Sequence, residues 1–144
     1  MSATYDEDLY TWSLEQATLL RTRKFDQIDL EHIIEEIEDL SKSERRALQS
    51  FLETLLMHLL KWQCQPAYQG RSWKFTIIEQ RKRIESHLQE NPGLKSKLPE
   101  LIEKAYGYAV TGAVRETGLA IQVFPPECPW SYEQFSNPDF WPSA

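Results

Sequence analysis

The sequence predicts an all-α protein, a bundle of four to five helices with a Pro- and aromatic-rich C-terminal tail packed on it. Apolar residues recur at intervals of three and four over most of the chain, which is the pattern of amphipathic helices. Only 5 of the 144 residues are glycine, fewer than a turn-rich β-sandwich needs. The length and the hydrophobic content of 41% are typical of one globular unit, so we expect residues 1–144 to form a single helical domain.

The first two helices are expected over residues 5–23 and 29–40. Three acids at positions 6–8 place negative charge where it stabilises a helix N-terminus. Asp29 is the expected N-cap of the second helix, whose apolar residues form one stripe at helical spacing. This stripe consists of Leu30, Ile33, Ile34, Ile37 and Leu40.

A third helix is expected over residues 43–64, ending before Pro66. The segment Ser41–Glu44 has the composition of a capping box, which predicts a short break after the second helix. The alternative is that the second and third helices form one helix with a kink. The apolar residues of the third helix are Leu48, Phe51, Leu52, Leu55, Leu56, Leu59 and Trp62.

The fourth and fifth helices are expected over residues 72–90 and 97–117. Ser72 is the expected cap of the fourth helix. Pro99 lies near the first turn of the fifth helix, and Gly118 is its expected C-terminal stop. Small residues on the inner face of the fifth helix should let a neighbouring helix come close. This face consists of Leu101, Ala105, Tyr108, Ala109 and Gly112.

The tail, residues 120–144, carries several prolines and aromatic side chains. A segment this aromatic is expected to pack on the bundle rather than face solvent. Within it, Ser131–Gln134 has the spacing of a capping box and predicts a one-turn helix. The aromatic residues of the tail are Phe124, Trp130, Phe135, Phe140 and Trp141.

Charge is unevenly distributed along the chain, whose net charge is −6. Residues 1–44 hold 12 acids and 4 bases, whereas residues 45–84 hold 8 bases and 2 acids. The favoured interpretation is that acidic and basic helices pack together, within one bundle or across a dimer. The alternative is a basic groove for a phosphate-bearing ligand. The overall acidity disfavours general attraction to nucleic acids or membranes.

The cysteines and the N-terminus indicate a cytoplasmic protein. Cys64 and Cys128 lack zinc-type spacing, and such isolated cysteines fit a reducing compartment. Met1–Asp8 is polar and acidic, unlike a signal or transit peptide. No apolar run approaches the roughly 18–20 residues of a membrane helix, so we expect no membrane association.

Several sequence motifs together resemble a known bacterial family. They are Tyr5–Trp12, Leu30–Leu40, Ser43–Arg46, Leu56–Trp62, Ser72-Trp73 followed by Arg81, and Phe124–Trp130. In these motifs, which extend over nearly the whole chain, the sequence is similar to the domain of unknown function 29 family, common in cyanobacteria and found in other bacteria. The resemblance implies a small helical protein with no established activity, and it assigns no catalytic residues.

Three polar residues at the edges of the predicted apolar faces form the candidate site: Glu36, His58 and Arg81. Helical wheels allow them to meet between the second, third and fourth helices, where polar groups near a core need partners. The favoured interpretation is a salt-bridge network that fixes helix register. The alternative is a catalytic or ligand-binding pocket, with Glu36 as base or ligand, His58 as acid–base or ligand and Arg81 as anion holder. Lys61 and Trp73 would line that pocket.

No metal or cofactor is expected. His32 and Glu36 lie four residues apart, so both could bind one metal, with His58 as a third ligand. However, the sequence has neither the paired E-x-x-H motifs of di-iron bundles nor an H-E-x-x-H motif. Cys64 is expected to be a buried apolar residue rather than a nucleophile, and there is no phosphate-cradling glycine loop.

Basic residues in and before the fourth helix alternate with Trp73 and Phe75, an arrangement that could stack on bases and contact phosphates. The favoured interpretation is a solvated helix face, and nucleic acid is not the expected partner. The basic residues are Arg71, Lys74, Arg81, Lys82 and Arg83.

Three functions therefore remain open. The favoured one is a protein-interaction or regulatory module without enzymatic activity, which binds another protein or further copies of itself. The second is a small enzyme or ligand-binding protein that uses Glu36, His58 and Arg81. The third is a nucleic-acid-associated regulator that uses the basic fourth helix. The absence of a strong catalytic motif favours the first of these functions, the protein-interaction or regulatory module.

Overall fold

The structure is a computed structural model that describes residues 3–143, and within this range it contains helices and connecting segments but no β-strand. The predicted all-α fold class is confirmed. The α-helices are α1 (Leu9–Arg21), α2 (Leu30–Cys64), α3 (Arg71–Glu90), α4 (Leu98–Thr117) and α5 (Tyr132–Phe135). Short 3-10 helices are η1 (Pro66–Tyr68), η2 (Pro92–Lys97) and η3 (Ile121–Val123).

The chain divides into two compact units, Met1–Ser43 and Glu44–Ala144, where we expected one from the chain length. They are termed here the N-terminal unit and the C-terminal unit. The α2 helix contributes its first 14 residues to the former and the rest to the latter. Within the described range, no helix combines the length and the hydropathy that crossing a bilayer requires.

The predicted break between the second and third helices is wrong, because α2 is continuous from Leu30 to Cys64. Ser41–Glu44 lies inside this helix and caps nothing. Neither proline nor glycine interrupts the helix, and the residues after Ser43 are mostly good helix formers. At its start, the predicted cap is confirmed: the Asp29 carbonyl accepts from the Ile33 N–H at 3.0 Å, and its carboxylate accepts from the His32 N–H at 3.4 Å.

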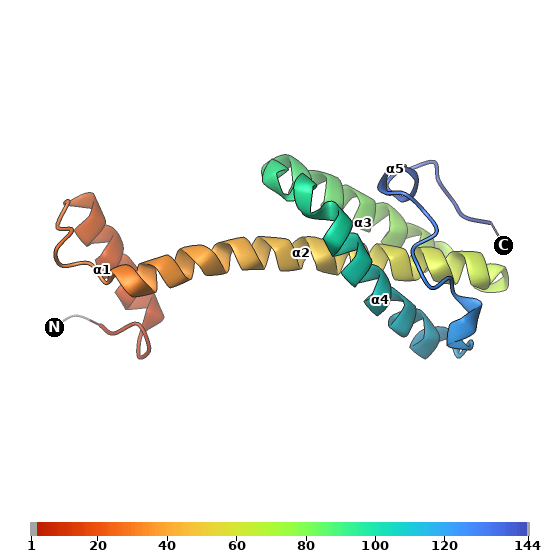
Figure 1. Ribbon diagram of the computed structural model, residues 1–144, viewed down its shortest axis with the longest axis horizontal. Helices are drawn as coiled ribbons and strands as arrows, with labels where there is room; N and C mark the ends of the chain where they lie inside the picture. Colours follow the sequence, from red (N-terminus) through yellow and green to blue (C-terminus); the bar gives the residue numbers. More distant parts are fainter. Residues whose placement is uncertain (1–2, 144) are drawn as a thin grey trace. The chain divides into compact units, whose positions relative to one another are not determined.

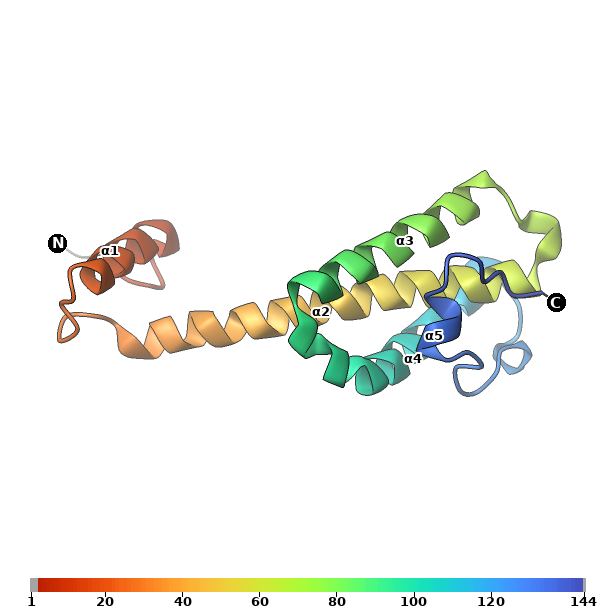
Figure 2. The same ribbon diagram turned by 90° about the horizontal axis from the view of Figure 1, so that it is seen from above.

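In the C-terminal unit, α3 and α4 pack on the C-terminal part of α2 (Figures 1 and 2). The leucines of α2 that the spacing placed on one face are buried: Leu48, Leu52, Leu55, Leu56 and Leu59. The small residues Ala105, Ala109 and Gly112 of α4 are buried as predicted, which allows the close packing of α4. Tyr108 was expected on this inner face but is exposed, and Tyr106 is buried in its place, donating a hydrogen bond to the Pro125 carbonyl.

The ends of the helices follow local chemistry in most places. Gly118 ends α4 with a φ of 73°, a left-handed conformation that glycine adopts without strain. Pro99 lies in the first turn of α4 as predicted. Ser72 does not cap α3, because the helix begins one residue earlier, at Arg71, with Gly70 in the cap position.

The tail packs on the C-terminal unit as predicted, with Phe124, Trp130 and Phe135 buried. The one-turn helix α5 is confirmed together with its capping box. The Ser131 hydroxyl accepts from the Gln134 N–H at 3.2 Å, and the Gln134 side chain accepts from the Ser131 N–H at 3.0 Å. Further along, the Trp141 ring lies 4.8 Å from that of Trp62 in α2, centroid to centroid.

Candidate functional site

The predicted network of Glu36, His58 and Arg81 is not formed, because each side chain has other partners. Glu36 accepts a hydrogen bond from the Tyr5 hydroxyl. His58 bonds through Nδ1 to the Thr54 carbonyl one helical turn before it, at 2.8 Å. Burial of the His58 ring lowers its pKa, so the neutral imidazole is favoured.

Arg81 is held by the tail instead of by a carboxylate. Its guanidinium donates hydrogen bonds to the carbonyls of Phe135 at 2.9 Å and Phe140 at 2.6 Å, and more weakly to Pro138 at 3.4 Å. The side chain is only 6% exposed and lies over the Trp141 ring. These partners are backbone atoms more than 50 residues away, so no side-chain spacing in the sequence could indicate them.

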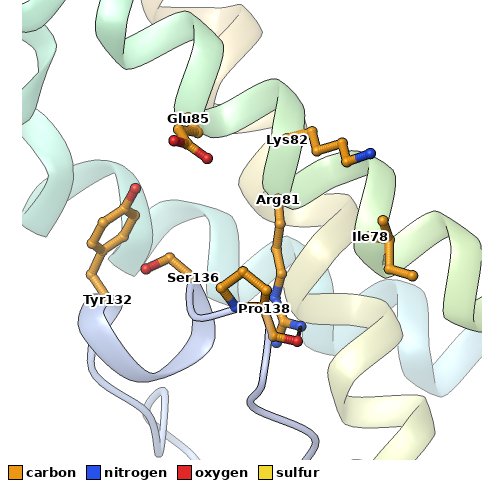
Figure 3. A pocket seen from close by; sticks show the side chains of 7 residues that line it. All are labelled: Ile78, Arg81, Lys82, Glu85, Tyr132, Ser136 and Pro138. Carbon is orange, nitrogen blue, oxygen red and sulfur yellow. Dashed lines mark hydrogen bonds between the residues drawn. The ribbon is translucent and has the colours of Figure 1, made fainter.

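A small cavity next to Arg81, of about 190 Å³, lies between α3 and the α5 region. In Figure 3, Arg81 extends from α3 towards the tail at Pro138, and Tyr132 and Ser136 face the same space. The volume is below the roughly 300–1,000 Å³ of typical ligand pockets. Because the Arg81 donors already bind carbonyls, the predicted role as an anion holder does not fit this geometry.

Lys61 and Trp73 do come together, with a partner that the sequence analysis missed. The Lys61 ammonium lies 2.8 Å from Oε1 of Glu116 and 4.7 Å from the centre of the Trp73 ring. The hydrogen bond from Lys61 lowers the pKa of Glu116, which favours its charged form. Glu116 lies 55 residues after Lys61, and only the packing of α4 against α2 reveals the pair. Its local role is to compensate a buried ammonium group.

A second polar cluster joins α1, the segment before it and the start of α2. The Asp29 carboxylate accepts from the Trp12 indole at 3.1 Å and lies 2.7 Å from Nδ1 of His32. The Tyr5 ring stacks on His32 with 4.1 Å between ring centroids. The hydrogen bond between the His32 ring and the Asp29 carboxylate raises the pKa of His32. Tyr5 and Trp12 are the first and last residues of the family motif Tyr5–Trp12, but the sequence analysis assigned neither of them to a polar cluster.

The weak metal candidates His32, Glu36 and His58 do not form a metal site. His32 pairs with Asp29, and Glu36 binds Tyr5. Among residues 3–143 no group of three or more His, Cys, Asp or Glu side chains is arranged to hold a metal ion. Cys64 and Cys128 are both free thiols, and burial raises the pKa of each, which disfavours the reactive thiolate.

The basic segment of α3 offers fewer free cations than its sequence suggests. Arg81 is buried, and Arg83 pairs with Glu79 one turn earlier at 2.7 Å. The Arg71 guanidinium lies over the Phe75 ring. The ring of Trp73, one of the expected stacking residues, is already in contact with the Lys61 ammonium group.

The N-terminal unit exposes the apolar stripe that the sequence marked most clearly. Leu30, Ile34, Ile37 and Leu40 are 57%, 45%, 58% and 65% exposed, contrary to their expected place in a bundle core. We term these four residues the α2 apolar face. The physical reason is that Tyr5 and Trp12 pack on the polar flank of α2, at His32 and Glu36, rather than on the stripe.

Exposed apolar side chains are concentrated in this unit. Nine of the 14 large hydrophobic residues that are exposed in the described range lie before residue 44, and only Trp12 and Gln16 are buried there. The nine are Leu9, Tyr10, Leu14, Leu20, Phe25, Leu30, Ile34, Ile37 and Leu40. The N-terminal unit therefore has little hydrophobic core of its own.

Comparison with known protein families gives a match over nearly the whole chain. A family model described as "Domain of unknown function DUF29" covers residues 4–141. The chain belongs to the DUF29 family. No curated protein and no solved structure matches the chain at a significant level of similarity.

The DUF29 match confirms the family resemblance indicated by the sequence motifs. It extends over both units, from the residue before Tyr5 to Trp141 at the end of the tail. The family description names no activity. The function of this DUF29 protein therefore has to be argued from its surfaces and clusters.

Proposed function

We propose that this DUF29 protein is a non-enzymatic protein-interaction module whose binding surface is the α2 apolar face of the N-terminal unit. The observation that carries the proposal is the 45–65% exposure of four large aliphatic side chains at consecutive helical turns. Full burial of one such side chain is worth about 1.5–3 kcal/mol. Covering these half-exposed residues together therefore offers roughly 3–6 kcal/mol to a binding partner before entropic losses.

The neighbouring helix supports the proposal. A shallow groove of about 360 Å³ lies along α1, lined by Thr11, Leu14, Glu15, Thr18 and Leu19. Together with the α2 apolar face, it gives the unit two helices with exposed apolar positions, the usual means by which helical modules bind other helices.

The two free cysteines fit a reducing compartment, and we place the module in the cytoplasm.

The polar clusters favour this function over an enzymatic one. Arg81 is engaged by three carbonyls, Lys61 by Glu116, and His32 by Asp29. Each of these groups is satisfied by a partner within its own unit, which is the state of a structural polar group rather than of an open catalytic site.

A photo-crosslinking experiment tests the proposal. A photoreactive phenylalanine analogue is placed at Ile37 in the full chain, in cells that naturally produce the protein. The matched control carries the analogue at Tyr108, which is 64% exposed on α4 of the other unit. We expect Ile37 to crosslink to a defined polypeptide that Tyr108 does not capture.

The captured polypeptide is then purified and its binding measured directly. Ile34→Gln combined with Ile37→Gln should weaken binding by at least about ten-fold, while circular dichroism shows an unchanged helix content. Equal crosslinking at Ile37 and Tyr108, or binding unaffected by the double substitution, contradicts the proposed function.

A further inference from the structure

Charged residues beside the α2 apolar face restrict what can bind there. Between residues 25 and 41 the chain has seven acids and neither lysine nor arginine. Five of these acids are exposed, and none of the five forms an ion pair within residues 3–143: Asp26, Glu31, Glu35, Glu38 and Asp39. The apolar face therefore lies in a strongly negative environment.

The acids occupy particular positions on the helix. At 100° per residue, Glu31 and Glu38 lie within about 60° of Ile34, along one edge of the apolar face. They are seven residues apart, so they repeat in register with Leu30 and Ile37. In paired helices, the positions that flank an apolar seam determine which partner is accepted. The opposite edge, at Glu36, is occupied by Tyr5.

We infer that the occupant, on the function proposed above, is an amphipathic α-helix of a partner protein that carries lysine or arginine beside its apolar seam. Its Leu, Ile or Val residues, spaced three and four apart, pack on Leu30, Ile34 and Ile37. Its basic residues face Glu31 and Glu38. Burial of the apolar side chains supplies affinity, and the charge pairs select the partner.

The same charges argue against a second copy of this chain. A two-fold interface through the α2 apolar face brings two identical stretches together, each with seven acids and no base between residues 25 and 41. Like charges next to a helix seam destabilise pairing, and no lysine or arginine in this stretch is available to offset them. A basic helix removes this repulsion.

Three synthetic peptides of about 21 residues, three heptads each, test the inference. The first has a Leu/Ile seam with lysine at the flanking positions, the second has the same seam with glutamate there, and the third keeps the lysines but has serine in the seam. Each is titrated against the full chain by fluorescence anisotropy at about 0.15 M salt.

We expect the lysine-flanked peptide to bind at least about ten-fold more tightly than either of the others, a difference of roughly 1.4 kcal/mol. Ile34→Gln with Ile37→Gln should abolish its binding. Glu31→Gln with Glu38→Gln should reduce the preference for lysine over glutamate to about three-fold or less. Tyr108→Ser, at an exposed aromatic residue of the other unit, is the control and should change nothing.

Several results would overturn the inference. Equal binding of the lysine- and glutamate-flanked peptides, lost in the Ile34/Ile37 variant, identifies a polypeptide site without basic preference and leaves the proposed function intact. Equal binding of the two lysine-containing peptides, one with the Leu/Ile seam and one with the serine seam, shows that binding depends on positive charge alone. A dimer in light scattering that becomes monomeric on Ile34→Gln with Ile37→Gln makes a second copy the occupant. Failure of all peptides also rejects the basic helix, whereas crosslinking at Ile37 still decides the proposed function separately.

Discussion

The Nε atom of Arg81 donates a 2.9 Å hydrogen bond to the backbone carbonyl of Phe135, 54 residues further along the chain. The terminal nitrogens of the same guanidinium reach the carbonyls of Pro138 and Phe140. The planar guanidinium has five N–H donors in a fixed geometry, so it can bind three carbonyls at once. Arg81 thus fastens the tail to α3.

Arg81→Met should lower the free energy of unfolding by about 2–4 kcal/mol, because it leaves partly buried carbonyls without donors. Urea denaturation followed by tryptophan fluorescence measures this change. Arg83→Met is the control: its pair with Glu79 is exposed, so we expect a change within about 0.5 kcal/mol. Equal effects of the two substitutions would show that the tail does not depend on Arg81.

Two histidines should titrate on opposite sides of their ordinary pKa of 6.5. The hydrogen bond to Asp29 raises the pKa of His32, so this pair stabilises the protein fully below pH 6.5 and less as pH rises through the folded-state pKa. Burial lowers the pKa of His58, which therefore reduces stability as pH falls below 6.5. Proton NMR titration of the imidazole resonances measures both midpoints.

Asp29, the partner of His32, sets the lower limit of the pH range in which their pair stabilises the protein. The hydrogen bond to His32 lowers the pKa of Asp29 below 3.8, so its contribution is present above that pH and is lost as pH falls through the folded-state pKa. The pair is therefore most stabilising between pH 3.8 and 6.5. Asp29→Asn should bring the His32 midpoint down towards 6.5 and leave His58 unchanged. A shift of both midpoints would mean that the substitution acts through the fold.

Two glycines of α4 should respond differently to alanine. At Gly107 an added Cβ meets nothing within 4 Å, so Gly107→Ala should stabilise by about 0.5–1 kcal/mol through helix propensity. At Gly112 it would lie 2.6 Å from Sδ of Met57, and overpacking costs about 1–3 kcal/mol. We expect Gly112→Ala to give no gain or a net loss in thermal and urea unfolding.

The contact with Met57 can be isolated by a double-mutant cycle. In a Met57→Ala background the obstructing sulfur is absent, and Gly112→Ala should then stabilise as Gly107→Ala does. If Gly112→Ala has the same effect in both backgrounds, the close approach of α4 to α2 at Gly112 is not what makes glycine necessary.

The ion pair between the buried Lys61 and the half-exposed Glu116 should respond differently to mutation of its two members. Glu116→Gln leaves the buried ammonium without its charged partner and should cost about 1–3 kcal/mol. Lys61→Met removes the buried charge itself, and the half-exposed Glu116 is hydrated, so its cost should be smaller. Urea unfolding of both variants and of the double variant measures these changes in the free energy of unfolding. A larger loss of stability for Lys61→Met than for Glu116→Gln would show that the buried ammonium is not the group that depends on its partner.

Local chemistry made much of the fold predictable. Asp29, Gly118 and the Ser131 capping box act within a few residues of themselves, so their effect can be recognised without knowing what packs nearby. The helix break predicted at Ser41–Glu44 was wrong, because a capping motif separates two helices only where tertiary packing or a helix breaker also ends the first one. The continuous α2 has neither proline nor glycine there.

The candidate site was less predictable, because its partners are distant in sequence. A helical wheel indicates which residues are at the edge of a face, and it identified Glu36, His58 and Arg81 as polar residues that need partners. It does not indicate whether that partner is a carboxylate of another helix or a carbonyl of the tail. Glu116 and the Phe135 carbonyl could be assigned only from the packed structure.

The sequence by itself determined that the chain is all-α and which residues share a face, since both follow from the helical period. It did not determine which faces are covered. Leu30, Ile34 and Ile37 have the same spacing as Leu48, Leu52 and Leu55, yet the first three are exposed and the last three are buried. Only tertiary structure distinguishes them, because the covering elements, α3, α4 and the tail, all pack on the C-terminal part of α2 within its own unit.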